Sequence, residues 1–372
     1  MQFTAFSAIA ADDWNRVVLE SDDGWALSTY EWLEMVTDVW SQRSPMDNIG
    51  FAIEENDRLV AVMPLHWIPE LKLISSSGWG AGGPVVLNGF SENKREKLWK
   101  NCVDEAQRIA VQKEAAVIKI MICASTRSSL NNQWGINPLI KHGFADTSTQ
   151  SLVINLEPEE DVLWQALGKN TRRTIERVSA AGYSAKRTPW SQMIDAYFDA
   201  HVETYERTGV TPHPKSYFSG IAKMPEEYFP LWVGFTPQGE AAAFHGDISF
   251  GGSEFYFVGC SQSEHIETGI NSLLFWEAIR GAKQRGNDWY ESGEVFPDAV
   301  SGKEHGLTVF KSKFGGQNHR YFKGEKVMVV PDHEPFEPVI APISPLREWL
   351  RATRSLGRAI AEHIYGLLRR NS

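Results

Sequence analysis

Three apolar segments rich in phenylalanine, tyrosine and valine follow one another between residues 231 and 259. A Pro-Gln-Gly sequence at residues 237–239 and a Gly-Gly pair at residues 251–252 separate them. Short segments of this composition, divided by turn residues, are typical of β-strands joined by tight turns. The pattern therefore predicts an antiparallel meander in this part of the chain.

The pattern then changes to the period of a helix. Apolar residues recur three or four positions apart from Ile270 onward, Thr268 or Asn271 can cap the start, and a glycine can end the helix. A strand is expected at residues 289–293, and a last strand within residues 307–316, which begin with Leu-Thr-Val-Phe. The predicted order is three strands, a helix and two further strands.

The same order of elements occurs about 180 residues earlier, which indicates an internal duplication. A helix is expected at residues 24–41, a hairpin turns at Asn56 and Asp57, and a second helix and a buried strand follow. Between the halves, one long helix is expected over residues 159–182. We therefore expect an α/β (α+β) fold with two domains, each a mixed, mostly antiparallel sheet flanked by helices. A length of 372 residues suits two domains.

Composition and charge narrow the class of protein. The formal net charge of −10 argues against general binding of polyanions, so a nucleic-acid partner would need a local basic surface. The three cysteines form no Cys-x-x-Cys motif, which indicates a reducing compartment and argues against structural zinc. No secretory signal opens the chain, and no apolar run approaches the ~18 residues of a membrane span. These features favour a cytoplasmic protein without a metal site.

Three segments of the second half resemble the FemA, FemB and FemX family. They are the helix at residues 270–286, the Tyr-Glu-Ser-Gly-Glu sequence at residues 290–294 and the Phe-Lys-x-x-Phe-Gly-Gly motif at residues 310–316. The resemblance extends over residues 25–325. It implies tandem acyltransferase domains of the GNAT fold, in which two splayed strands hold the acyl donor. The CelD/BcsL-type acyltransferases of exopolysaccharide loci are similar to the first half to about the same degree.

The resemblance and the duplication together set the expected domains. Residues 1–155 form an N-terminal GNAT-like domain, and residues 156–328 form the catalytic one. Residues 329–372 are expected to be a Pro-rich tether and a basic amphipathic helix. We hypothesise that this helix lies on an anionic membrane surface. The alternatives are that it packs on the protein body or binds tRNA.

The resemblance also gives roles to two residues. Lys311 stands where the family has a lysine near the aminoacyl ester, and its ammonium can stabilise the oxyanion that forms when the carbonyl is attacked. Glu291 can accept the proton of the attacking amine. The structural alternative for Lys311 is a solvated lysine on a strand, and for Glu291 it is a carboxylate bonded to strand N–H groups. For His245 with Asp247 the alternative is a hydrogen-bonded structural pair. The further substrate-binding candidates are Phe310, Arg207, Asn271, His245, Asp247, Tyr30 and Trp32.

A basic ladder precedes the second domain's sheet. Lys169, Arg173 and Arg177 recur four residues apart, with Arg172 beside them. Such a ladder of like charges repels itself unless an anion compensates. Binding of a phosphate group or of a tRNA backbone is therefore predicted for Lys169, Arg172 and Arg173. The alternative is a set of ion pairs with the nearby acidic residues Glu159, Glu160 and Glu176.

Amide-forming acyl transfer fits these features best. The favoured reaction moves an aminoacyl group from aminoacyl-tRNA to an amino group of a peptidoglycan-like cell-envelope precursor, with no cofactor. A lipid-linked precursor would bring the protein to the inner face of the membrane. The coenzyme A signature is missing from residues 263–271, where Glu264 and Glu267 would repel a pyrophosphate. The alternatives are an acyl-CoA-dependent N-acyltransferase acting on an amino sugar in surface polysaccharide biosynthesis, and a non-catalytic scaffold that binds glycan precursors.

Overall fold

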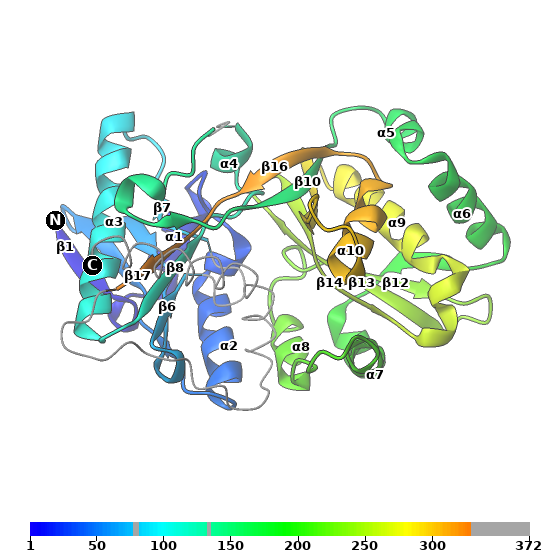
Figure 1. Ribbon diagram of the computed structural model, residues 1–372, viewed down its shortest axis with the longest axis horizontal. Coiled ribbons are helices and arrows are strands. Elements are labelled where there is room, and N and C mark those ends of the chain that lie inside the picture. The colour runs from blue at the N-terminus through cyan, green and yellow to red at the C-terminus, as the bar shows by residue number, and fades with distance from the viewer. Residues whose placement is uncertain (77–81, 132–134, 329–372) are drawn as a thin grey trace, which may run out of the picture.

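The chain folds into two halves that lie side by side (Figure 1). The computed structural model describes residues 1–76, 82–131 and 135–328, so the expected tether and basic helix lie outside the described residues. Each half combines β-strands with helices packed around them, which confirms the α/β class expected from the sequence.

The N-terminal half contains two sheets. Pro64 separates β4 from β5, and proline cannot donate a hydrogen bond to a sheet, which suits the division at this point. The first sheet has the order β1 (Gln2–Ala5), β3 (Phe51–Glu55), β4 (Arg58–Met63) and β7 (Val85–Val86). The second has the order β2 (Asp47–Asn48), β5 (His66–Ile68), β6 (Leu73–Ser75), β8 (Val117–Met121), β17 (Lys323–Val327) and β9 (Ala145–Asp146). The α-helices are α1 (Ala11–Leu19), α2 (Tyr30–Ser41), α3 (Glu92–Gln112) and α4 (Arg127–Asn131).

The C-terminal half contains one seven-stranded sheet. Its order is β11 (Ser184–Arg187), β12 (Leu231–Phe235), β13 (Ala241–Phe250), β14 (Ser253–Ser261), β15 (Trp289–Val295), β10 (Thr149–Asn155) and β16 (Gln317–Tyr321). The predicted meander is confirmed by the antiparallel pairs β12–β13 and β13–β14. The helices are α5 (Glu160–Ala166), α6 (Lys169–Ala180), α7 (Trp190–Thr208), α8 (Lys215–Ile221), α9 (Ile270–Gln284) and α10 (Gly302–Ser312).

The two halves repeat one arrangement. In the N-terminal half the parallel strands β6 and β8 flank α3 in the sequence, and in the C-terminal half the parallel strands β14 and β15 flank α9. Each parallel pair follows an antiparallel hairpin, β3–β4 or β12–β13. The internal duplication predicted from the sequence is therefore present in the fold.

Two predicted elements are wrong. Residues 307–312 of the expected strand are instead the end of α10, and residues 313–316 follow it without forming a strand. Phe310 in the helix and Phe314 just after it pack together and against Phe275, which stabilises the helical conformation. The helix expected over residues 159–182 is two helices, α5 and α6. The break comes at Leu167, whose backbone is extended with ψ of 146°.

A two-stranded ribbon crosses from one half to the other (Figure 1). Its first strand is β9 followed by β10, and its second is β16 followed by β17. β10 and β16 pair within the C-terminal sheet, whereas β9 and β17 pair within the N-terminal one. Membership of the sheets therefore changes between residues 146 and 149 and again between residues 321 and 323, whereas the sequence predicted a boundary after residue 155 and a second domain that runs to residue 328.

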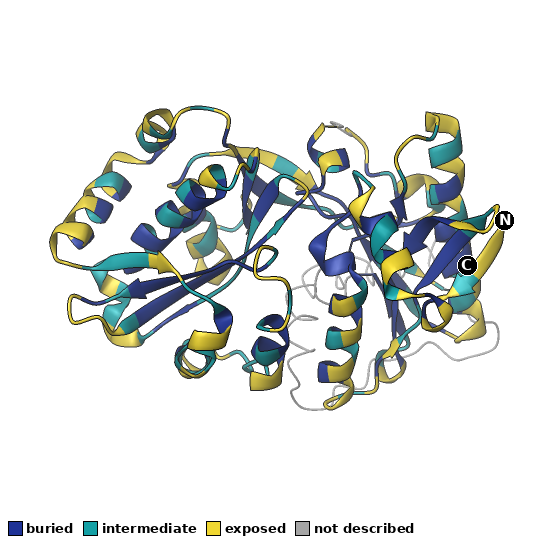
Figure 2. Cartoon of the chain, turned by 180° about the vertical axis from the view of Figure 1, so that it is seen from behind, coloured by how far each residue is buried: buried dark blue, intermediate teal, exposed yellow. Residues whose placement is uncertain are grey.

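Aromatic side chains join the halves. Trp25 packs edge-on against Phe255 with ring centroids 6.1 Å apart, and Trp32 stacks on Phe229 at 5.4 Å. Both tryptophans belong to the N-terminal half and both phenylalanines to the C-terminal half, so one hydrophobic cluster extends through the molecule. Figure 2 shows the buried strands at the centre and the exposed residues on the outer helices.

Candidate functional site

A wedge between β14 and β15 lies near the middle of the C-terminal sheet. The two strands pair in parallel only through Ser253–Phe255 and Trp289–Glu291. Beyond these residues β14 stays paired with β13, and β15 stays paired with β10. The strands therefore diverge, and their facing edges can receive a side chain or a ligand.

Lys311 of α10 lies in this wedge. Its ammonium donates a hydrogen bond of 2.8 Å to the main-chain carbonyl of Glu294 on β15. The same ammonium lies 5.9 Å from the ring centroid of Tyr256 on β14, and the residue is only 7% exposed. The interaction with the aromatic face favours the charged amine at this place. The lysine expected to follow a strand thus comes from a helix and reaches between two strands.

Gly293 makes room for this amine. A Cβ atom at Gly293 would lie 2.8 Å from Lys311 Nζ, closer than such contacts allow. The backbone of Gly293 also has φ of +86°, a conformation that other residues rarely adopt. The conformation therefore favours glycine here, and any side chain at this position would displace the lysine ammonium.

Glu291 provides a buried carboxyl beside the amine. It is 2% exposed, and Ser151 Oγ donates a hydrogen bond of 2.5 Å to it. Burial raises the pKa of Glu291 to about 7, against the lowering effect of Ser151 and Lys311. Burial lowers the pKa of Lys311 to about 8, against the raising effect of Glu291 and Glu294. Near neutral pH the carboxyl can therefore exchange a proton while the lysine keeps its charge.

An ion pair borders the wedge. Lys323 Nζ lies 2.5 Å from Glu294 Oε1, and the Thr149 hydroxyl donates to the same oxygen. Burial raises the pKa of Glu294, but Lys323 and Thr149 outweigh that effect, and the pKa lies below its ordinary value. Neither Glu294 nor Lys323 was predicted as a site residue: the Tyr-Glu-Ser-Gly-Glu sequence assigned a role only to Glu291, and no spacing along the chain connects Glu294 with Lys323.

A β-bulge shapes the strand that carries both carboxylates. Ser151 pairs with Glu294 and Val153 pairs with Glu291, so β15 advances three residues while β10 advances two. The extra residue, together with the positive φ of Gly293, turns the strand so that the carbonyl of Glu294 meets Lys311.

His245 and Asp247 form a buried network behind the wedge. His245 Nε2 lies 2.8 Å from Asp247 Oδ1 and 2.8 Å from the Tyr290 hydroxyl, which donates to Asp247 at 3.0 Å. Burial lowers the pKa of His245 to about 3, so its ring is neutral. The ring stacks on Tyr256 with centroids 4.4 Å apart. The structure thus places this pair against the ring that faces Lys311.

The basic ladder lies on α6, and its members differ. Arg172 donates to the main-chain carbonyls of Trp164, Gln165 and Leu167 at the end of α5. Arg177 donates to the carbonyl of Thr268, one residue before the glycine that starts α9. Lys169 and Arg173 are exposed. The ion pairs offered as the alternative are not formed in the described part of the chain, where Glu160 pairs with Arg280 instead.

Arg207 and Asn271 lie near the start of α9. Arg207 donates to Ser263 Oγ at 2.6 Å, and Asn271 donates to Ser261 Oγ at 3.4 Å. Asn271 therefore contacts the last residue of β14, and Arg207 contacts the segment between β14 and α9. Glu264 and Glu267 lie in this segment and disfavour a phosphate group there.

The remaining candidates are aromatic and lie in hydrophobic surroundings. Trp32 is fully buried and stacked on Phe229. Tyr30 stacks on Phe6 with centroids 4.3 Å apart. Phe310 is half-buried against Phe275 and Phe314. The structure does not bring these rings together with Lys311 into one surface.

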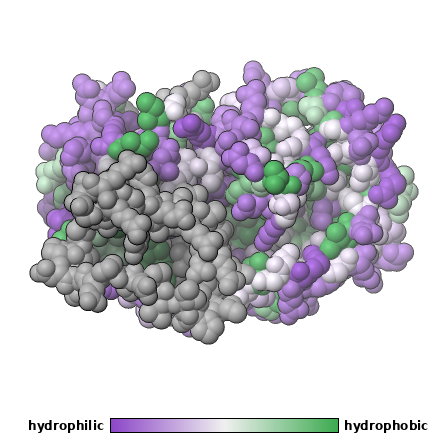
Figure 3. Space-filling view, viewed as in Figure 1, coloured by the Kyte–Doolittle hydropathy of each residue, from purple (hydrophilic) through white to green (hydrophobic). Residues whose placement is uncertain are grey.

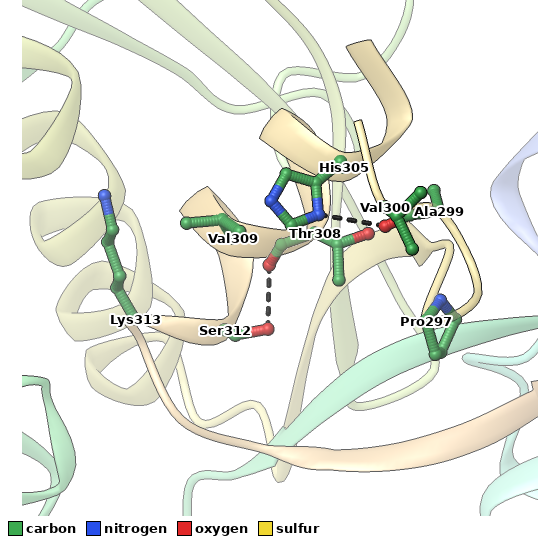
Figure 4. A pocket seen from close by; sticks show the side chains of 8 residues that line it. All are labelled: Pro297, Ala299, Val300, His305, Thr308, Val309, Ser312 and Lys313. Carbon is green, nitrogen blue, oxygen red and sulfur yellow. Dashed lines mark hydrogen bonds between the residues drawn. The ribbon is translucent and has the colours of Figure 1, made fainter. Parts of the chain in front are cut away.

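A cavity of about 620 Å³ opens on a different face of α10 from Lys311. His305, Thr308, Val309 and Ser312 line it from the helix, and the loop that includes Ala299 faces them (Figure 4). His305 Nδ1 donates to the carbonyl of Ala299 at 2.9 Å. The surface around it is mostly hydrophilic, with a few hydrophobic side chains in the region of α10 (Figure 3).

The described residues contain neither a candidate metal site nor a helix that could span a membrane. Within residues 1–76, 82–131 and 135–328, no group of three or more His, Cys, Asp or Glu side chains is placed to hold a metal ion. None of the helices in these ranges is long and apolar enough to cross a bilayer.

Comparison with known proteins gives similarity to acyltransferases. The acetyltransferase (GNAT) domain family matches residues 167–305. The fold is similar to that of FemX, with a TM-score of 0.66 and 15% identity over 88% of this chain and 98% of that one. It is also similar to L-PGS from Bacillus licheniformis, with a TM-score of 0.54 and 13% identity over 85% of this chain and 91% of that one. Among the curated proteins, no sequence is significantly similar to this chain.

A third similar structure is a C-terminal domain (DUF2156) from Agrobacterium fabrum, assigned to a lysylphosphatidylglycerol synthetase. Its TM-score is 0.52, with 12% identity over 85% of this chain and 91% of that one. At these identities the likeness establishes the fold. The tandem GNAT fold expected from the resemblance is confirmed, and the C-terminal half carries an acyltransferase domain of the GNAT type.

Proposed function

We propose that this acyltransferase forms an amide bond at the wedge between β14 and β15, and that Lys311 and Glu291 carry the reaction. The observation that supports this most is the buried Lys311 ammonium between the splayed strands, with a carboxyl whose pKa is about 7 on the adjoining strand. A solvated lysine would not need Gly293 to make room for it.

The reaction balances with these two groups. The amine nitrogen of the acceptor attacks the acyl carbonyl carbon, and the Lys311 ammonium stabilises the oxyanion that forms. Glu291 takes the proton that the attacking nitrogen loses. The bond to the leaving group then breaks, and the leaving oxygen or sulfur receives the proton held by Glu291, which returns the carboxylate. The burial of both side chains excludes water, which would otherwise compete with the amine.

For the donor we favour aminoacyl-tRNA, and for the acceptor an amino group of a cell-envelope precursor. The similarity to FemX and L-PGS supports this choice. So do the exposed Lys169 and Arg173 on α6, which can contact a phosphate backbone. A lipid-linked glycan precursor at the inner face of the membrane is the form of acceptor that we expect.

The second candidate is an acyl-CoA-dependent N-acyltransferase acting on an amino sugar. The match of residues 167–305 to the acetyltransferase (GNAT) domain favours it. The experiment that separates the two incubates the protein with ¹⁴C-labelled aminoacyl-tRNA or ¹⁴C-labelled acetyl-CoA and a mixture of amino-sugar and peptidoglycan-precursor amines. Label in the amide product from tRNA supports the first proposal, and label only from acetyl-CoA replaces it with the second.

A further inference from the structure

Lys323 reaches the wedge from the other half of the molecule. It lies on β17, which pairs with β8 and β9 in the N-terminal sheet. Its ammonium nevertheless contacts Glu294 on β15 of the C-terminal sheet, 2.5 Å away. The lysine side chain is only 24% exposed and lies over the Tyr321 ring at 4.7 Å. The ribbon between the halves therefore brings a charge of the N-terminal sheet to the wedge.

Glu294 makes contacts through both its side chain and its main chain. Its carboxylate binds Lys323 and Thr149, whereas its main-chain carbonyl accepts the hydrogen bond of Lys311. Without Lys323, the half-buried Glu294 carboxylate would attract the Lys311 ammonium, which is the other cation that acts on it. The pair with Lys323 removes this competition.

We propose that Lys323 is a positioning residue for acyl transfer: it occupies the Glu294 carboxylate and so keeps the Lys311 ammonium at the main-chain carbonyl, facing the acyl group. This inference rests on the proposed function of the wedge. It also makes the N-terminal half a contributor to the site, where the sequence predicted chemistry from the C-terminal half alone.

The charges around the wedge agree with this role. Glu291 and Glu294 are matched by Lys311 and Lys323, so the cluster holds two carboxyl groups and two ammonium groups. Lys323 lowers the pKa of both carboxyls. In the part of the chain that the structure describes, the other polar and titratable groups that face the cluster lie on or next to four strands. They are Thr149 and Ser151 on β10, Tyr256 on β14, Tyr321 on β16 and Cys123 just after β8.

The test compares Lys323→Met with Lys323→Arg and Lys326→Met. Lys326 lies on the same strand but donates to Gln107 and His142, away from the wedge, so its variant controls for the fold. In Lys323→Met we expect kcat to fall up to about 100-fold with little change in KM, because the reacting groups are misplaced. The rising limb of the pH–rate profile should also move to higher pH, because the pKa of Glu291 rises without this cation. Lys323→Arg should keep the wild-type kcat and the wild-type pH–rate profile.

The double variant Glu294→Gln/Lys323→Met makes the test specific. A glutamine carries no negative charge and attracts an ammonium far less than a carboxylate does, so the double variant should be faster than Lys323→Met alone. A merely structural pair predicts that the double variant is no faster. That result, an unchanged pH profile in Lys323→Met, or an equal loss in Lys326→Met would overturn the proposal.

A measurement without substrate separates this proposal from the proposed function. Carboxyl ¹³C NMR of protein labelled at glutamate follows the titration of Glu291 and Glu294 in the resting protein. Lys323→Met should raise the pKa of Glu291, and Lys326→Met should leave it unchanged. Unmoved titrations would refute the role of Lys323 even where acyl transfer is observed. Shifted titrations in a chain that transfers no acyl group would refute the proposed function instead.

Discussion

Gly293 decides where the Lys311 ammonium can lie. We expect Gly293→Ala to abolish most activity, because the new methyl group would lie 2.8 Å from Lys311 Nζ, and to cost about 1–3 kcal/mol of stability through its positive φ. Gly239→Ala is the matched control, since Gly239 also has φ of +86° but has no atom within 4 Å of its Cβ position. Acyl-transfer rates and thermal unfolding check both. Equal activity in the two variants would show that the lysine tolerates displacement.

The pKa values of the wedge predict a narrow pH optimum. Glu291 must be ionised to accept a proton, so kcat/KM should rise with pH through about 7. Lys311 must be protonated to stabilise an oxyanion, so kcat/KM should fall above about 8. Glu291→Gln should lose the rising limb, whereas Glu240→Gln, at an exposed turn, should keep it. A wild-type profile without a rising limb near neutrality would contradict the role of Glu291.

Among single residues, the sequence assigned roles to Lys311 and Glu291 but not to the residues that contact them. Lys311 and Glu291 were found through the resemblance. Ser151, Glu294 and Lys323 were not found, since their contacts are made by strand pairing and a β-bulge rather than by spacing along the chain.

Among the elements, α5 and α6 show how a predicted binding residue can have a structural contact. Arg172 is half-buried and donates to three carbonyls at the end of α5, whereas Arg173 is exposed. We expect Arg172→Ala to lower the free energy of unfolding by about 1–3 kcal/mol, because those hydrogen bonds to a charged group are lost. Arg173→Ala should leave stability unchanged.

The exposed residues of α6 should matter for binding instead of stability. The double variant Lys169→Ala/Arg173→Ala should bind tRNA more weakly, and its binding should depend less on salt concentration. Urea unfolding and filter binding at several salt concentrations measure the two effects. If the two arginine variants unfold at the same urea concentration, the capping role of Arg172 is wrong.

The prediction of a strand within residues 307–316 is wrong because it used only the local preference of the residues. The adjacent β-branched residues Thr308 and Val309 favour a strand. In the structure, Phe310 and Phe314 lie one helical turn apart against Phe275, and this tertiary contact decides for the helix. Helix α9 was predicted correctly because its apolar period is long and regular.

At the scale of the whole molecule, the ribbon of β9–β10 and β16–β17 holds the halves together with the aromatic interface. β17 lies between β8 and β9, and β16 pairs with β10. A chain shortened to end at residue 316 should therefore lose cooperative unfolding. A chain that ends at residue 328 should keep a single transition. Circular dichroism during heating distinguishes them, and an unchanged transition at 316 would show that the ribbon is dispensable.

The duplication could be predicted from the sequence because both halves repeat the same order of apolar segments. The pairing of β17 with the N-terminal sheet and of β10 with the C-terminal sheet could not be predicted, since the partners of both strands lie far away in the sequence. The location of the wedge followed from the resemblance, but the contribution of the N-terminal sheet to it became visible only in the fold.

The role of Lys311 in stabilising the oxyanion is tested most directly by the rate of acyl transfer in Lys311→Ala. Lys303→Ala is the control, because Lys303 is an exposed lysine on the same helix. We expect Lys311→Ala to stay folded and to transfer the acyl group about 10²–10³-fold more slowly, which is the cost of losing one group that stabilises an oxyanion. Lys303→Ala should keep the wild-type rate. A folded Lys311→Ala protein that transfers at the wild-type rate would contradict the account.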